Sequence, residues 1–118
     1  MTRPIVHFEI LGKDAKKLQD FYSALFGWSI DANNPMNYGL IGPTVGAPEN
    51  GIGGGIAASQ DGKPFVTVYV QVVDLNETLK KAESLGGKPV MQPMDVPGGP
   101  SIAQFSDPEG NVVGLVKQ

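Results

Sequence analysis

The sequence predicts an α+β fold made of two βαβββ modules in tandem, which form a curved mixed sheet around a cleft. Two segments with strand-like alternation, each followed by a capped helix, and a recurrence of the whole pattern after about 60 residues support this prediction. The 118 residues suit one domain with a single core. We therefore expect one domain, with module 1 at about 1–58, a linker at 59–64 and module 2 at about 65–118.

The first module is predicted to open with a half-buried strand. Its apolar positions are Val6, Phe8 and Ile10, and its polar positions are His7 and Glu9. This period-two pattern is typical of a strand with one buried face. Asp14 can cap a following helix, and Gly27 can end it in a left-handed conformation. Further strands are predicted at Trp28–Ile30, Asn37–Ile41 and Gly51–Ala58, and a loop at Gly42–Asn50.

The first predicted helix carries an aromatic stripe. Its apolar residues at helical spacing are Leu18, Phe21, Tyr22, Leu25 and Phe26. Such spacing favours one face buried against a sheet. We expect Phe21, Tyr22 and Phe26 to be core residues, and Trp28 to pack under the helix.

The second module repeats the pattern. Phe65–Val73 alternates like a strand, and Asp74 followed by Glu77 predicts a capping-box-like helix start. The apolar stripe of this helix is Leu75, Leu79, Ala82 and Leu85, and Gly86-Gly87 ends it. Strands are predicted at Val90–Gln92, Ser101–Ser106 and Asn111–Val116, with a loop at Pro93–Pro100 and a tight turn at Asp107–Gly110.

A shift of about 60 residues aligns the modules in strand parity and in helix caps together. The matched pairs include Asp14 and Asp74, Gly27 and Gly87, His7 and Thr67, and Glu9 and Tyr69. If the two sheets curve toward each other, the polar faces of their first strands line a cleft. The alternative is that these faces meet solvent, as in any antiparallel sheet with one wet side.

Seven polar residues are candidates for contact with a ligand in this cleft. They are His7, Glu9, Tyr38, Thr67, Tyr69, Gln71 and Gln104. We expect Glu9 to be solvated or paired rather than to act as a base, and no catalytic residue is assigned. The glycines from Gly51 to Gly55 leave room for a ligand or a partner strand to approach the backbone.

Composition and charge exclude several classes of function. The net charge is −3 and there is no basic run, so we expect no nucleic-acid partner. There is no apolar stretch of membrane-spanning length, and no N-terminal apolar region typical of a signal peptide. The absence of cysteine excludes disulfides and thiolate metal sites. A cytoplasmic location is the default expectation.

Several motifs resemble a known family. HFEI leads into a helix that ends FYSALFGW, the second helix leaves through AESLGGKP, and the chain closes with SDPEGNVVGLV. Over nearly the whole chain this resembles the vicinal oxygen chelate superfamily, which includes glyoxalase I, bleomycin resistance proteins and extradiol dioxygenases. It is most similar to the short glyoxalase-like members. The resemblance implies a curved sheet around a cleft and a homodimer.

In metal-dependent members of that superfamily, the first and last strands of each module supply the ligands of a divalent ion. By the resemblance these slots fall on His7, Thr67, a glycine near Gly55, and Gly114. Glycine has no donor side chain, and a threonine hydroxyl is a poor ligand for zinc or nickel. One histidine also cannot supply a two-histidine, one-carboxylate iron site.

We therefore expect no metal and no cofactor, and a glyoxalase-like protein whose cleft binds a small organic ligand. Sequestration of a metabolite or an antibiotic would suit such a cleft. The alternative is a metal-dependent lyase or dioxygenase of the same superfamily with a reorganised site, in which His7 acts with Glu9 and ligands from elsewhere.

Overall fold

The computed structural model describes residues 2–42 and 51–118. The described residues form two compact units, one of His7–Val66 and one of residues 2–6 with Thr67–Gln118. The units correspond to modules 1 and 2, except that the first residues of the chain group with module 2. Within the described ranges, neither helix is long and apolar enough to cross a membrane. Apart from Gly42, the predicted loop Gly42–Asn50 lies outside the described residues.

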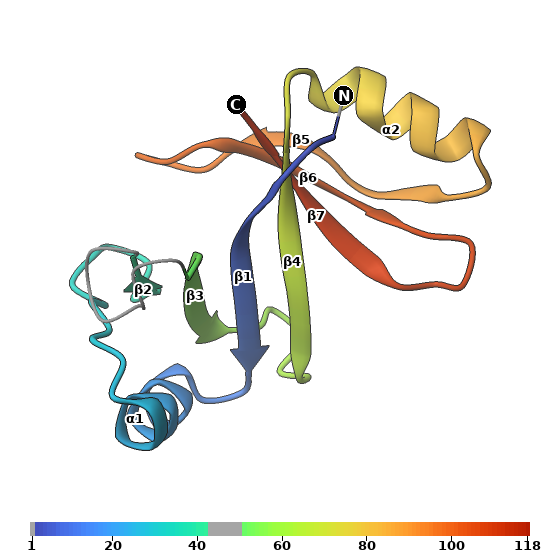
Figure 1. Cartoon of the computed structure of the whole chain (residues 1–118). Coiled ribbons are helices and arrows are strands. Elements are labelled where there is room, and N and C mark those ends of the chain that lie inside the picture. The colour runs from blue at the N-terminus through green and yellow to red at the C-terminus, as the bar shows by residue number, and fades with distance from the viewer. Residues whose placement is uncertain (1, 43–50) are drawn as a thin grey trace. The chain divides into compact units, whose positions relative to one another are not determined.

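Module 1 contains β1 (Ile5–Gly12), α1 (Ala15–Phe26), β2 (Gly39–Ile41) and β3 (Gly53–Ala58) (Figure 1). Strand β3 pairs in parallel with β1 and antiparallel with β2. The strand predicted at Trp28–Ile30 is wrong, because only Asp31 forms a bridge, with Leu40. The Asp31 carboxylate accepts the main-chain N–H of Asn33 at 2.9 Å, which begins a turn in place of a strand.

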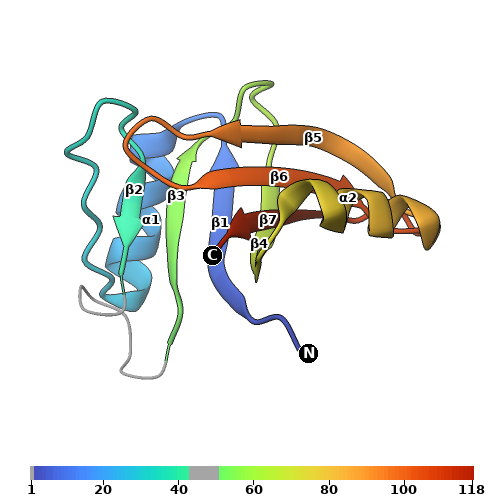
Figure 2. The ribbon, with the colours of Figure 1, turned by 90° about the horizontal axis from the view of Figure 1, so that it is seen from above.

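Module 2 contains β4 (Phe65–Val72), α2 (Leu75–Ser84), β5 (Lys88–Asp95), β6 (Ser101–Ser106) and β7 (Val112–Lys117). Figure 2 shows α2 lying across the sheet that β5, β6 and β7 form. Strand β7 is parallel to β4 and antiparallel to β6, which pairs antiparallel with β5. Strand β5 is longer than the predicted Val90–Gln92, because it continues through two register irregularities.

The two modules share one topology. In each, the first strand pairs in parallel with the last strand, and the last strand pairs antiparallel with the strand before it. Equivalent register pairs are Glu9 with Gly55 and Tyr69 with Gly114. This confirms the α+β class and the two repeated modules, of which module 2 has the full βαβββ order and module 1 has the Asp31–Leu40 bridge in place of its second strand. The cleft stays a prediction.

The two predicted helix starts and the predicted end of α1 are confirmed, whereas α2 ends at Ser84 with Leu85 as its C-cap, before Gly86-Gly87. The Asp14 carboxylate accepts the N–H of Lys17 at 3.1 Å, and the Asp74 carboxylate accepts that of Glu77 at 3.0 Å. Each cap of this kind stabilises a helix by about 1 kcal/mol. Gly27 ends α1 with a φ of 71°, in the left-handed region where glycine carries no Cβ penalty.

The core of module 2 lies between α2 and its sheet. Its buried residues are Val72, Leu75, Leu79, Ala103 and Leu115, and Val70 and Phe105 pack against them. Strand β4 therefore packs on α2 through Val70 and Val72. Leu85 is an exception to the predicted stripe: it lies beyond the last turn of α2 and is 70% exposed.

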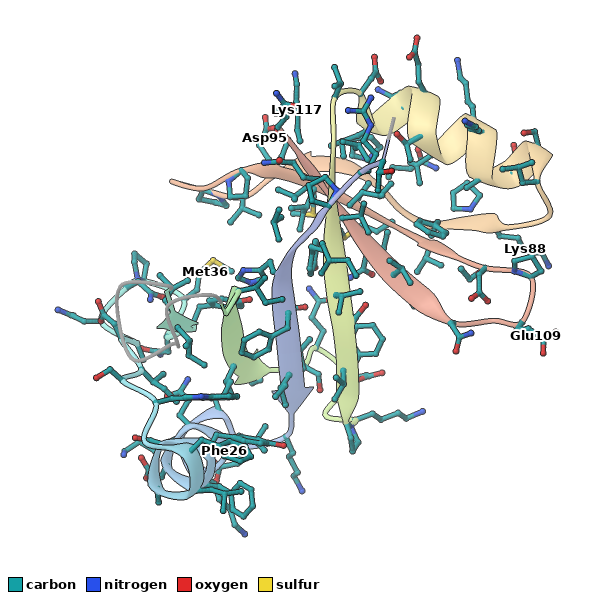
Figure 3. All side chains as sticks on the ribbon, viewed as in Figure 1. Phe26, Met36, Lys88, Asp95, Glu109 and Lys117 are labelled. Atoms are coloured by element: carbon teal, nitrogen blue, oxygen red, sulfur yellow. The ribbon has the colours of Figure 1, made fainter. Side chains whose placement is uncertain are left out.

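Helix α1 differs from α2, because none of its residues is buried. The prediction of core positions is wrong for Phe21 and Phe26, which are 58% and 56% exposed; Phe26 is labelled in Figure 3. These rings pack mainly on other rings: Phe21 lies edge-on to Tyr22, with centroids 5.1 Å apart. Trp28 contacts Phe26 at 5.1 Å and Phe8 at 5.5 Å, so it packs against the helix as predicted.

Candidate ligand-binding site

Three of the seven candidate residues converge in module 1. His7 and Glu9 project from the same face of β1, and Tyr38 precedes β2. The hydroxyl of Tyr38 lies 2.9 Å from Nε2 of His7 and donates to Oε2 of Glu9 at 2.8 Å. All three side chains are half-buried. The phenol of Tyr38 therefore bridges the imidazole and the carboxylate. We call these residues the Tyr38 cluster.

The hydrogen bonds of the Tyr38 cluster have a direction. A phenol has one proton to donate, and here Glu9 receives it. The oxygen of Tyr38 can then only accept from His7, which assigns the proton of the neutral imidazole to Nε2. Burial lowers the pKa of His7 below its ordinary value, so the ring is neutral at pH 7. The array can orient a ligand through its ordered hydrogen bonds.

Two glycines of β3 lie directly against aromatic side chains of module 1. Gly55 lies opposite Glu9 in the register, and a Cβ built on Gly55 would overlap the ring of Tyr38. A Cβ on the neighbouring Gly54 would overlap the ring of Phe8. Neighbouring residues of a strand face opposite sides of the sheet. Gly55 therefore lies on the face that carries Tyr38 and Glu9, and Gly54 lies on the face that carries Phe8. In module 1 the chain's own aromatic rings therefore use the room that these two glycines leave.

The sequence did not single out two residues that hold the segment carrying Tyr38. The side-chain amide of Asn34 donates to the carbonyl of Tyr38 at 2.7 Å and accepts its N–H at 2.9 Å. The amide of Gln19 on α1 donates to the carbonyls of Ile56 at 2.8 Å and Asn37 at 3.3 Å. The only signal for Asn34 was the turn-rich composition of residues 31–36, where asparagine is favoured, and Gln19 had no such signal.

Module 2 brings together Tyr69 and Gln104. Tyr69 is 6% exposed, and its hydroxyl lies 3.4 Å from the amide nitrogen of Gln104. A Cβ on Gly114 would lie 2.5 Å from the Tyr69 ring, so a tyrosine also covers the last-strand glycine here. The hydroxyl of Thr67 is buried and donates to the carbonyl of Val112 at 2.8 Å. Gln71 is half-buried on the same strand as Tyr69.

The residues present do not fit the metal site that the resemblance implies. Gly55 and Gly114 offer no donor atom, and tyrosine rings lie where their side chains would extend. The oxygen of Thr67 is a neutral donor already engaged with a main-chain carbonyl. Within residues 2–42 and 51–118, there is no group of three histidine, cysteine or acidic side chains that could hold an ion.

Two hollows lie elsewhere in the described parts of the chain. One of about 280 Å³ in module 2 is lined partly by Asp74, Asp95 and Lys117, of which the last two are labelled in Figure 3. A wide open groove of about 1230 Å³ runs along α1 in module 1, beside Phe21 and Tyr22. None of the seven candidate residues lines either hollow.

Sequence comparisons connect the chain to known proteins. The family model described as Glyoxalase/Bleomycin resistance protein/Dioxygenase superfamily matches residues 4–115. The anthracycline biosynthesis protein DnrV of Streptomyces peucetius is 30% identical over 119 residues, which cover 87% of this chain and 42% of DnrV. DauV of Streptomyces sp. (strain C5), also an anthracycline biosynthesis protein, matches to the same extent. The chain thus spans about two fifths of the length of these relatives.

Solved structures show the same fold at low identity. A methylmalonyl-CoA epimerase from Mycobacterium tuberculosis is 15% identical with a TM-score of 0.64, over 96% of this chain and 86% of that one. A glyoxalase/bleomycin resistance protein/dioxygenase superfamily member from Vibrio splendidus 12B01 is 14% identical with a TM-score of 0.62, over 99% of this chain and 100% of that one. The chain belongs to the glyoxalase/bleomycin resistance protein/dioxygenase superfamily.

Proposed function

We propose that the chain is a cytoplasmic protein that binds a small organic molecule without a metal ion, through the Tyr38 cluster. The proposal rests on one observation: the phenol of Tyr38 bridges His7 and Glu9 above the bare backbone of Gly55. A half-buried set of convergent polar groups beside aromatic surface is typical of sites that orient small ligands.

We propose a planar hydroxyaromatic ligand. The rings of His7 and Tyr38 are nearly parallel, with 16° between their planes and 6.3 Å between their centroids, an arrangement that suits a planar aromatic ligand. With these internal bonds made, Nδ1 of the imidazole and the carboxylate of Glu9 are acceptors, which suit the hydroxyl groups of a ligand. DnrV and DauV are named for anthracycline biosynthesis, which makes such aromatic compounds the first to test. Sequestration of an antibiotic or metabolite is the corresponding role.

We also propose that the chain forms a homodimer. The large exposed apolar residues of α1, Phe21, Leu25 and Phe26, would lose contact with water in such an assembly. Analytical ultracentrifugation at micromolar concentration tests this directly. A mass of two chains supports the dimer, and a mass of one chain refutes it.

Isothermal titration tests the binding proposal. The probes are 1,8-dihydroxyanthraquinone, an anthracycline, and a panel of non-aromatic metabolites. Tyr38→Phe removes only the bridging hydroxyl, and Tyr22→Phe removes a hydroxyl on α1 as a matched control. We expect affinity for the aromatic probes to fall about tenfold in Tyr38→Phe, as for the loss of one hydrogen bond, and to stay unchanged in Tyr22→Phe. The absence of binding to the whole panel would refute the proposal.

A further inference from the structure

The geometry points to Asn34 as a positioning residue: its side-chain amide fixes the main chain of Tyr38 and thereby places the phenol between His7 and Glu9. This inference rests on the proposed function, because it assigns Asn34 a role in ligand binding through Tyr38. Asn34 lies four residues before Tyr38, outside any helix or strand.

Asn34 satisfies both main-chain groups of Tyr38 with one side chain. Its Nδ2 donates to the carbonyl at 2.7 Å, and its Oδ1 accepts the N–H at 2.9 Å. The pair of bonds resembles the one that a neighbouring strand would form. Asparagine has both a donor and an acceptor at this reach, whereas an ionised aspartate has acceptors only and alanine has neither. The side chain of residue 34 therefore determines how many main-chain groups of Tyr38 are hydrogen-bonded to it. Asparagine binds both the carbonyl and the N–H, aspartate only the N–H, and alanine neither.

The backbone before Tyr38 needs such support. Asn37 has a φ of 51°, in the left-handed region that few residues with a Cβ adopt and that asparagine enters most readily among them. Its N–H donates to the carbonyl of Asn34 at 3.1 Å, so the chain turns sharply between Asn34 and Asn37. This turn places Tyr38 immediately before Gly39, the first residue of β2. If the main chain of Tyr38 had no hydrogen-bond partners, its Cα would not be held in place, and neither would the ring that projects from it.

Gln19 ties the same turn to the strand that carries Gly55. Its amide donates to the carbonyls of Asn37 and Ile56, so one side chain bridges α1, the turn and β3. In the repeat, Gln19 matches Leu79, which is 3% exposed in the core of module 2. At this position module 1 has a polar side chain that forms hydrogen bonds to main-chain carbonyls, whereas module 2 has an apolar side chain that packs in its core. Here the helix holds the turn that presents Tyr38, in addition to packing on the sheet.

A purely local role is the competing explanation, in which Asn34 stabilises the turn and does not affect ligand binding. The two roles differ in what they do at His7. A turn-stabilising role predicts lower stability with an unchanged imidazole, because His7 lies on β1. A positioning role predicts that the imidazole responds, because the hydroxyl of Tyr38 bonds Nε2 of His7.

His7 is the only histidine, so its NMR signals are unambiguous. The experiment measures the pKa of His7 by NMR titration and the affinity for 1,8-dihydroxyanthraquinone, in Asn34→Ala and in Asn33→Ala. Asn33 is a matched control, because its main-chain N–H forms its bond to Asp31. We expect Asn34→Ala to raise the pKa of His7 toward its ordinary value as Tyr38 loosens, and to weaken binding about fivefold, with Asn33→Ala unchanged.

A double variant distinguishes an effect of Asn34 on ligand affinity that acts through Tyr38 from an effect that Asn34 exerts directly. In a Tyr38→Phe background, Asn34→Ala should weaken binding by less than twofold more, because the hydroxyl that Asn34 positions is already gone. If Asn34→Ala does not fold, Asn34→Asp carries the test, since it keeps the bond from the N–H of Tyr38 and loses the one to its carbonyl.

Unchanged His7 titration and unchanged affinity in a folded, destabilised Asn34 variant would overturn the inference and leave the proposed function standing. If the wild-type protein binds no probe of the panel, the proposed function fails, and the inference that rests on it fails as well. A rise in the pKa of His7 in Asn34→Ala would then assign Asn34 only a structural role in the cluster.

Discussion

The ring of Tyr38 lies against the main chain of Gly55, in the space that a side chain at residue 55 would occupy. The face of β3 can therefore carry either a side chain at this position or the tyrosine ring, but not both. Tyr69 and Gly114 repeat the relationship in module 2. These are the two last-strand positions to which the resemblance assigns metal ligands, and in this chain a tyrosine ring covers each of them.

Gly55→Ala should displace Tyr38. The added methyl would overlap the ring, and overpacking of this kind costs roughly 1–3 kcal/mol in the free energy of unfolding. Removing the ring as well should relieve the overlap, so Gly55→Ala should cost less in a Tyr38→Ala background than alone. Urea unfolding of the four proteins of this double-mutant cycle measures the coupling. Strictly additive effects would show that the ring does not rest on Gly55.

His7 should make stability depend on pH. Burial lowers its pKa in the folded protein, whereas the ordinary value of about 6.5 applies when the chain is unfolded. Below that value the unfolded chain binds the proton more readily. The stability contributed by neutral His7 is therefore fully present above about pH 6.5 and is lost as the pH falls through the lower folded-state pKa.

Urea unfolding between about pH 5 and 8 compares the wild type with His7→Gln. Glutamine does not titrate, and its amide can still donate to Tyr38. We expect the free energy of unfolding to fall less steeply below pH 6.5 in His7→Gln. The same slope in both proteins would contradict burial of the neutral imidazole.

The core of module 2 should depend strongly on Leu79. Leu79→Ala removes a side chain that is 3% exposed, and such changes cost about 2–5 kcal/mol. Leu85→Ala is a matched control, because that leucine is 70% exposed and should change stability by about 0.5 kcal/mol or less. Chemical unfolding gives both values. Similar costs for the two variants would be inconsistent with the packing of α2.

Divalent metals should bind weakly if at all. Gly55 and Gly114 have no side-chain donor for a metal, and the hydroxyl of Thr67 is already bonded to a main-chain carbonyl. Zinc or nickel should therefore leave the melting temperature of the untagged protein unchanged. Metal analysis of that protein supplies the companion measurement. Stoichiometric metal that disappears in His7→Ala would establish a reorganised site and contradict this prediction.

Much of the fold was predictable because local chemistry and the repeat agree. Strand alternation predicted β1 and β4, and Asp14 and Asp74 predicted the helix starts that the structure confirms. The predicted turn Asp107–Gly110 is also confirmed: Gly110 has a φ of 91°. Hydrogen bonds, first from the side chain of Asn111, lower the pKa of Asp107. These features depend on residues close in sequence, which a single sequence displays directly.

The site was only partly predictable. His7 and Glu9 follow from strand parity, but their bridge through Tyr38 joins residues about 30 positions apart. The role of Asn34 depends on a turn whose left-handed residue is an asparagine, which spacing alone does not identify. The aromatic spacing on α1 correctly predicted a helix but wrongly predicted that Phe21 and Phe26 are buried. Rings that stack on one another along a helix recur with the same spacing as residues of a buried face.

The most direct test of the account follows the imidazole signals of His7 during titration with 1,8-dihydroxyanthraquinone. Binding at the Tyr38 cluster predicts saturable shifts of these signals in the wild type. In Tyr38→Phe, saturation should require about tenfold more ligand. Binding that leaves the His7 signals in place, or that saturates equally in both proteins, would contradict the assignment of the ligand site to His7, Tyr38 and Glu9.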